Sequence, residues 1–318
     1  MLARTADNLY WLARYVERAD YVARIVGVTR RLASLPAAKG APRLEWDSAL
    51  AAAGVDAAYL ARHGQTCADT AIDYLVFDPE NASSIVSCVE FGRTNARAVR
   101  TALTAETWDV INSGWLEFQQ LRRARAARPD DHDNLARALE LASKLSFDVD
   151  GSSYRSMLRN DAYWFGRVGL YIERADNTAR ILDVKYNILL PETEVVGGSL
   201  DYFQWTAILR SVSALTAYNW IYRDTVRPSL VTELLILRPE MPRSLISCYD
   251  NVARYLEAIA AAYKTTGPSQ AHAHDMLAKL RSTSVSDVFH VGLHEFLTTF
   301  IENNSQLGQK MTDQYLVE

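Results

Sequence analysis

Apolar residues near the N-terminus recur at alternating intervals of three and four positions. The positions in this series are Leu9, Leu12, Val16, Ala19, Ala23 and Val26. Such spacing predicts a helix with a packing seam, and we expect it to run from about Arg4 to about Leu35. Because Trp11, Tyr15 and Val22 make a second flank apolar, the helix is predicted to lie buried between neighbours.

The same pattern returns in the middle of the chain. YVERADYVARIV at residues 15–26 recurs as YIERADNTARIL at residues 171–182, with eight of twelve positions identical. FDPENASSIVSCVE at residues 77–90 likewise aligns with LRPEMPRSLISCYD at residues 237–250. We therefore predict one domain, 1–318, built from two similar tandem halves of about 1–150 and 151–318. A binding site, if present, is expected where the halves meet.

The rest of the chain also predicts helices, separated by short breaks. Asp78-Pro79 is typical of a helix start, with Asp as the cap and Pro at the first helical position. Residues 191–200 are expected to form a loop. Two further helices are expected to contain Trp46 to Tyr59 and Ile72 to Val76. The remaining expected helices span Ala105–Ala127, Asn134–Leu145, Asn160–Leu190, Phe203–Tyr222, Ser229–Leu237, Ser244–Tyr263, Asp275–Leu280 and Val285–Tyr315.

Composition supports an all-α protein, a multi-helix bundle. Glycine and proline together number 23 (14 plus 9) in 318 residues, which leaves long stretches free of helix breakers. A formal charge of -4 argues against a protein that coats nucleic acid. No apolar run is long enough to span a membrane, and Arg4 and Asp7 precede any apolar run, unlike a signal peptide. With three cysteines and no CxxC, we expect a cytoplasmic protein.

Charged side chains on the two repeated helices need partners, because isolated buried ions are costly. Asp20 and Arg24 are four residues apart and can pair within the helix, whereas Glu17 needs a donor from Arg14 or from another helix. Arg18 is expected to point toward the far side. Candidate ligand- or partner-binding residues are Glu17, Arg18, Asp20, Arg24, Glu173, Arg174, Asp176 and Arg180.

Three interpretations of this charged set stay open. The set could be a structural ion-pair network that fixes the register of the helices. The two copies could instead face each other across a polar cleft that binds a ligand. A docking surface for a partner protein is the third interpretation.

The N-terminal MLARTADNLYWLARYVERADYVARI, the second YIERADNTARIL and the late GLHEFL resemble the alpha-E family of bacterial helical domains. The resemblance covers essentially the whole chain and implies an all-helical fold. Members are typically encoded beside, or fused to, circularly permuted ATP-grasp ligases and transglutaminase-like peptidases. This setting implies such proteins as partners and a role in ATP-dependent amide or peptide bond formation. It assigns no catalytic residue.

The sequence gives only weak signals for a metal site, a catalytic cysteine or a cofactor. Asp287, His290 and His294 share one face of the last predicted helix, but without an HExxH motif we favour a structural role over a metal site. Cys88 and Cys248 occupy equivalent positions and are expected in the core. No Walker, GxGxxG or GxSxG motif occurs, so no cofactor is predicted. The amide-rich stretch at residues 302–308 could join a polar interior network or line a cleft.

These observations lead to three expectations for function. The first is an accessory or scaffold protein that acts with an ATP-grasp-type amide or peptide ligase. The second is a stand-alone enzyme acting on a peptide or amide in a cleft lined by Glu17, Arg24, Glu173 and Arg180, with a carboxylate as acid or base. The third is a structural module that forms homo-oligomers.

Overall fold

A computed structural model describes the chain except for residues 35–44, 128–131, 188–197 and 317–318. Every regular element in the described residues is a helix, which confirms the all-α prediction. The elements up to residue 156 are α1 (Ala3–Ala33), α2 (Glu45–Ala52), α3 (Asp56–His63), α4 (Ala68–Val76), α5 (Ile85–Ala98), the 3-10 turn η1 (Arg100–Ala102), α6 (Ala105–Ala127) and α7 (His132–Ser156).

The later elements include two short π-helical turns. They are α8 (Asp161–Asn187), α9 (Ser199–Ser211), α10 (Leu215–Tyr222), α11 (Pro228–Thr232), η2 (Glu233–Leu237), α12 (Leu245–Tyr263), α13 (Pro268–Ser282), α14 (Val285–Val291), α15 (Leu293–Met311) and η3 (Thr312–Leu316).

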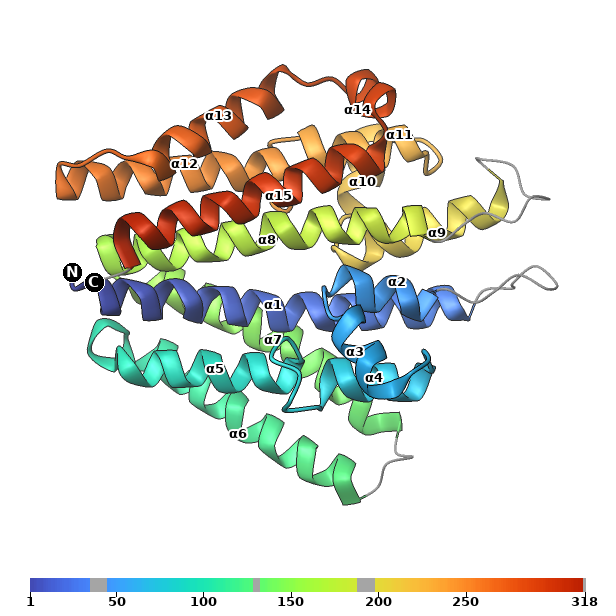
Figure 1. Ribbon diagram of the computed structural model, residues 1–318, viewed down its shortest axis with the longest axis horizontal. Coiled ribbons are helices and arrows are strands. Elements are labelled where there is room, and N and C mark those ends of the chain that lie inside the picture. Colours follow the sequence, from blue (N-terminus) through green and yellow to red (C-terminus); the bar gives the residue numbers. More distant parts are fainter. Residues whose placement is uncertain (35–44, 128–131, 188–197, 317–318) are drawn as a thin grey trace.

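Helices α1 and α8, which carry the repeated motif, run side by side through the middle of the molecule (Figure 1). They run in the same direction, because Tyr10 lies against Gly169 and Glu17 lies against Arg174 further along both helices. A Cβ atom at Gly169 would overlap the carbonyl oxygen of Tyr10, so the two backbones touch there. Ala19 on the predicted seam is fully buried, as a close helix contact requires.

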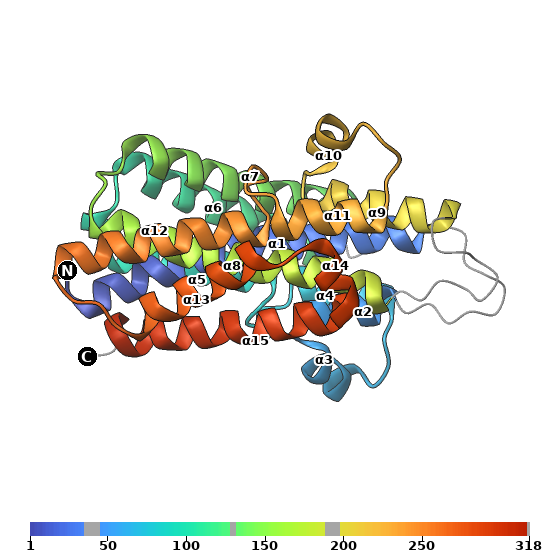
Figure 2. The same cartoon turned by 90° about the horizontal axis from the view of Figure 1, so that it is seen from above.

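Two groups of helices flank this central pair (Figures 1 and 2). On one side α5 and α7 pack on α1, and α6 packs on both of them. On the other side α12 and α15 pack on α8, and α13 packs on both of those. The start of α1 and the turn η3, which ends at Leu316, lie at the same end of the bundle (Figure 1). The central pair is therefore covered from both sides, and its polar groups have little access to water.

The boundary expected between the two halves falls inside a continuous helix. Helix α7 runs through Asp150 and Gly151 and ends at Ser156, and α8 begins at Asp161. Helix α7 packs on α1 and α6, and Asp150 forms ion pairs with Arg167 and Arg174 of α8, contacts that the local sequence does not reveal. The division into two tandem halves stays a prediction.

Three helices predicted as single elements are each broken in two. The breaks lie at Gly54, Ser213 and Gly292, which have φ angles of 68°, 58° and 101°. Positive φ is incompatible with a right-handed helix, so the chain turns at these residues. They separate α2 from α3, α9 from α10 and α14 from α15.

Asp78-Pro79 does not begin a helix. The carboxylate of Asp78 accepts a hydrogen bond from the backbone N–H of Glu80 at 2.9 Å, which forms a turn. Helix α5 is capped by Ser84 instead, whose hydroxyl oxygen accepts from the N–H of Ser87 at 3.2 Å. Of the loop expected at 191–200, residues 191–197 lie outside the described part of the chain, and α9 begins at Ser199.

Candidate functional site

Glu17 of α1 is held by an arginine from the other repeated helix. The side chain of Arg174 on α8 donates from Nε and Nη2 to the two carboxylate oxygens of Glu17, with both distances at 3.0 Å. Glu17 is 1% exposed, so this paired contact is formed out of water. A two-point contact between guanidinium and carboxylate is the strongest geometry for such a pair.

Glu173 of α8 is held in the reciprocal way. Arg18 donates from Nε at 2.6 Å and from Nη2 at 3.1 Å to the two oxygens of Glu173. Arg14 adds a third bond, from Nε at 2.7 Å. The motif glutamate of each helix therefore pairs with the motif arginine of the other.

One expectation for these arginines was wrong and one was met by its second alternative. Arg18 does not point toward the far side but binds Glu173. The donor to Glu17 comes from another helix, as Arg174, and Arg14 binds Glu173 instead. The cause is the close parallel contact of α1 with α8, which brings Glu173 within reach of both arginines. A single helix viewed alone contains no information on where its neighbour lies.

Asp20 completes the Glu17 site together with an arginine from a distant segment. Arg24 donates from Nε to Asp20 at 2.7 Å, as the spacing of four residues predicted. Arg243, which immediately precedes the Ser244 cap of α12, donates to Glu17 at 2.8 Å and to Asp20 at 2.9 Å. Sequence reasoning missed Arg243, because it lies in a turn outside the repeated Glu-Arg motif and the aligned position of the first copy is Ser83.

Asp176 and Arg180 form the corresponding pair on α8, with Nε 2.6 Å from the carboxylate. The side-chain amide of Asn304 on α15 donates to Asp176 at 3.4 Å and to the carbonyl of Ile172 at 3.1 Å. Tyr249 on α12 donates to the amide oxygen of Asn304 at 2.8 Å. The amide-rich stretch thus contributes Asn304 to the polar interior.

Both motif glutamates remain ionised in this environment. Burial by itself would raise the pKa of Glu17, but Arg174 and Arg243 outweigh burial and lower the pKa to about 2. Burial likewise opposes ionisation of Glu173, and Arg18 and Arg14 lower its pKa to about 2. The carboxylates are fixed anions near neutral pH, which does not suit a general acid or base.

The predicted polar cleft between the two motifs is a closed contact. Glu17 and Glu173 are 1% and 2% exposed, and the arginines of the opposite helix cover their oxygen atoms. The structure thus brings the candidate residues together, but a ligand would have to displace ion pairs to reach either glutamate. This geometry is that of a network that fixes two helices against each other.

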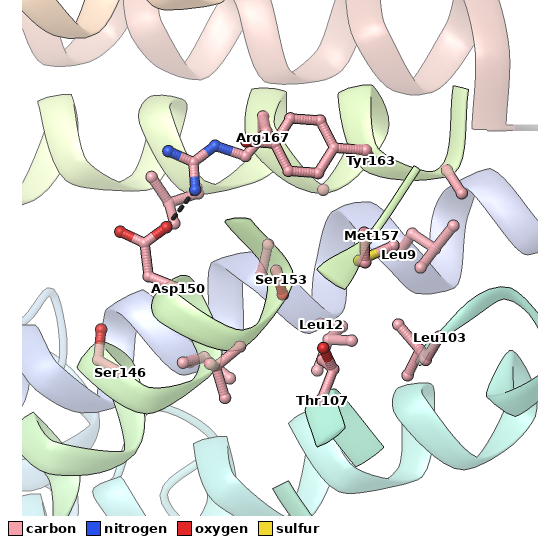
Figure 3. Close-up of a pocket in the computed structure, with 16 residues that line it drawn as sticks. Leu9, Leu12, Leu103, Thr107, Ser146, Asp150, Ser153, Met157, Tyr163 and Arg167 are labelled. Carbon is pink, nitrogen blue, oxygen red and sulfur yellow. Dashed lines mark hydrogen bonds and ion pairs between the residues drawn. The ribbon is translucent and has the colours of Figure 1, made fainter. Parts of the chain in front are cut away.

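A cavity of about 50 Å³ lies beside the network, between α1, the start of α6, α7 and α8 (Figure 3). Arg167 of α8 and Asp150 of α7 form an ion pair at its polar end. Asp150 also lies 3.8 Å from Arg174, which connects the cavity to the Glu17 site. Sequence reasoning missed Asp150 and Arg167, whose pairing depends on where α7 lies relative to α8.

Asp287, His290 and His294 do not share a helix face. Asp287 accepts from the N–H of Ser284 at 2.8 Å and caps α14, whereas Gly292 separates α14 from α15, which carries His294. His294 lies 2.7 Å from Asp183 of α8. Within the described ranges, no group of three or more metal-ligating side chains is close enough to hold an ion.

Cys88 and Cys248 are both buried in the core, as predicted. Burial raises the pKa of each thiol to about 12. Both thiols are therefore protonated near neutral pH, whereas a nucleophilic cysteine requires the thiolate.

Among the helices of the described residues, none has both the length and the apolar character needed to cross a bilayer.

Comparison with known proteins gives a family but no reaction. Residues 1–316 match the Alpha-E family model, described as a predicted alpha-helical domain with a conserved ER motif. An uncharacterised protein of Mycobacterium bovis and one of Mycobacterium tuberculosis are each 25% identical to this chain over 271 residues. The match covers 76% of this chain but 28% of each relative, so the chain spans less than a third of their length. No solved structure matches.

Proposed function

Because the chain belongs to the Alpha-E family, we propose that it is an accessory or scaffold module of an ATP-grasp-type system that forms amide or peptide bonds. Its expected partners are a circularly permuted ATP-grasp ligase and a transglutaminase-like protein, in the cytoplasm. The observation that carries the accessory role is the length of the mycobacterial relatives, in which the matching region is 28% of a much longer chain. The ATP-grasp-type system is what the resemblance to the family implies. A domain that recurs inside longer chains is one that works beside other domains.

The interior of the bundle supports a non-catalytic role for the repeated motif. Its glutamates are buried, ionised and covered by arginines, and the ion pairs join α1, α8 and the turn before α12. Catalysis by Glu17 or Glu173 would require a carboxylate that reaches substrate and changes protonation near neutral pH. The enzyme alternative would therefore need a site away from these glutamates.

Affinity purification of the tagged chain from its own host, followed by mass spectrometry, tests the proposal. We expect an ATP-grasp-type ligase or a transglutaminase-like protein to be recovered in near-equal amount. An unrelated helical protein with the same tag and expression level is the control for adventitious capture. Recovery of the chain alone, or only as a multiple of itself by light scattering, would contradict the accessory role; the second result would favour the oligomeric module.

A further inference from the structure

A groove of about 530 Å³ lies between the C-terminal half of α1, the N-terminal half of α7 and the end of α9. Both α7 and α9 pack on α1, so its walls belong to helices that are held together. The aliphatic part of its lining is formed by Ala23, Gly27, Val28, Ala136 and Leu139. The charged part is formed by four arginines and one glutamate: Arg24, Arg30, Arg31, Arg210 and Glu140. Grooves of about 300–1,000 Å³ are typical of binding sites in proteins.

Three of the four arginines have no partner in the described part of the chain. Arg24 is already neutralised by Asp20, whose carboxylate lies 2.7 Å from its Nε atom. Arg30, Arg31 and Arg210 are exposed, and their side chains form no ion pair or hydrogen bond with the described residues. Each of these three guanidinium groups is therefore available to an anion that enters the groove.

The positive charge of the groove exceeds what the ends of its helices require. Arg30 and Arg31 lie in the last turn of α1, and Arg210 lies in that of α9, where a cation complements the partial negative charge of a helix C-terminus. Each C-terminus amounts to about half an elementary charge, and Glu140 adds one full negative charge. Three unpaired arginines thus leave about one positive charge in excess, in a chain whose formal charge is -4.

The placement of the arginines favours anionic groups that are spaced along a ligand. The unpaired arginines come from two different helices, and a guanidinium binds one carboxylate through two parallel hydrogen bonds. A compact polyphosphate would concentrate its charge beside the C-termini of α1 and α9, whose partial negative charge repels it. Carboxylates spaced along a peptide can instead meet the arginines one by one.

The face of α7 that lines the groove continues beyond it as an exposed apolar surface. Ala136, Leu139 and Ser143 line the groove, and Phe147 lies about one helical turn past Ser143 on the same face. Tyr154 follows two turns later, and Phe147 and Tyr154 are both 62% exposed. A small anion would leave these rings uncovered, whereas a peptide that leaves the groove along α7 would cover Phe147. This continuity favours a segment of a protein over a free small molecule.

We propose that the groove binds an acidic segment of a partner protein. The carboxylates of the segment pair with Arg30, Arg31 and Arg210, and its apolar residues pack on Leu139 and Phe147. The inference rests on the accessory role proposed above for the existence of a partner. It adds the chemistry of the segment that docks and the surface that receives it.

Fluorescence anisotropy of a labelled synthetic peptide, with alternating glutamate and alanine residues and a terminal leucine, tests the groove in the full chain. We expect saturable binding with a dissociation constant on the order of 10–100 µM at low ionic strength. The same peptide with glutamine in place of glutamate should bind about tenfold more weakly or worse, because it carries no anion. Inorganic triphosphate at an equal concentration should not displace the peptide. Equal binding of the glutamine peptide, no saturable binding, or displacement by triphosphate would overturn the proposal.

Arg31→Gln and Arg210→Gln test whether the arginines of the groove hold the peptide. Neither substitution removes an ion pair within the described residues, and each should weaken binding about fivefold or more. Arg97→Gln is the matched control, because Arg97 is also an exposed arginine in the last turn of a helix, α5, but does not line the groove. It should bind like the unaltered chain. Equal binding by all three variants would place the peptide elsewhere and overturn the assignment.

Failure of this titration is distinguishable from failure of the accessory role. If affinity purification recovers a ligase but the glutamate peptide does not bind, the accessory role stands and the groove is rejected as the docking surface. If the peptide binds through Arg31 and Arg210 but the chain is recovered alone, the acidic-peptide site stands and the accessory role is contradicted.

Discussion

Glu17 and Glu173 occupy matching positions on two neighbouring helices, yet different arginines complete their sites. Each accepts a two-point contact from the motif arginine of the opposite helix. The second arginine of Glu17 is Arg243, from the turn before α12. The second arginine of Glu173 is Arg14, from α1 itself. The Glu17 site therefore ties three segments together, and the Glu173 site ties two.

The arginines also differ in their access to water. The side chains of Arg174 and Arg243 are 10% and 12% exposed, whereas those of Arg14 and Arg18 are 17% and 24% exposed. If Glu173 were removed, Arg14 and Arg18 could turn toward solvent more easily than Arg174 and Arg243 could after removal of Glu17. The repeated motif thus supplies the ion pairs of Glu17 with Arg174 and of Glu173 with Arg18. The burial of the arginines then determines how much each ion pair contributes to stability.

Removal of each carboxylate charge should give the largest effect and should separate the two sites. Glu17→Gln removes the carboxylate that Arg174 contacts at two points and one of the two carboxylates that bind Arg243, and we expect it to lower the free energy of unfolding by about 3–5 kcal/mol. Glu173→Gln should cost about 1–3 kcal/mol, because its more exposed arginines recover some hydration. Urea unfolding measures both values. A loss for Glu173→Gln that equals or exceeds that for Glu17→Gln would refute the difference.

Lowering the pH should reduce the free energy of unfolding through both Glu17 and Glu173. In both, the pKa of the glutamate falls from 4.5 to about 2 on folding, so the unfolded chain binds protons more readily. The stabilisation is complete above about pH 4.5 and is lost as the pH falls toward 2, by on the order of 3 kcal/mol for each glutamate. Unfolding free energies measured across this range should decline less steeply for either Gln variant. Identical slopes for the variants and the unaltered chain would contradict the lowered pKa values.

The pairing of each motif glutamate with the arginine of the opposite helix, here called the reciprocal exchange, also depends on the register of α1 against α8. Glycine substitutions test this register. At Gly169 a Cβ atom would overlap the backbone oxygen of Tyr10, so Gly169→Ala should cost about 1–3 kcal/mol despite the better helix propensity of alanine. At Gly166 the nearest atom, the carbonyl oxygen of Leu9, would be 3.8 Å away. Gly166→Ala is therefore the matched control and should be neutral or slightly stabilising in thermal unfolding. Equal losses at both positions would mean that the helices do not touch at Gly169.

Much of this arrangement is visible in the sequence because it follows from helical spacing. The alternating seam predicted a buried α1, and the spacing of four residues predicted the pair of Asp20 with Arg24, which the structure contains. The burial of Cys88 and Cys248 followed from their apolar surroundings. These features depend on residues within about one turn of each other.

Features that depend on the position of a neighbouring helix could not be predicted in this way. The target of Arg18 was unknown until α8 was placed beside α1. Arg243 has no counterpart in the repeat, since Ser83 stands at the aligned position. Ser213 gave no signal for a helix break, because serine seldom adopts the positive φ found there. The ion pair of Asp150 with Arg167 likewise depends on where α7 lies relative to α8.

The central claim is that each motif glutamate is bonded to the arginine of the opposite helix rather than to its own neighbour in sequence. A double-mutant cycle on urea unfolding tests this claim with the variants Glu17→Gln, Arg174→Gln and their combination, and with Arg18→Gln in place of Arg174→Gln as the control. We predict a coupling of about 2–3 kcal/mol between Glu17 and Arg174, and less than about 0.5 kcal/mol between Glu17 and Arg18. A coupling of Glu17 to Arg18 as large as that to Arg174 would contradict the reciprocal exchange.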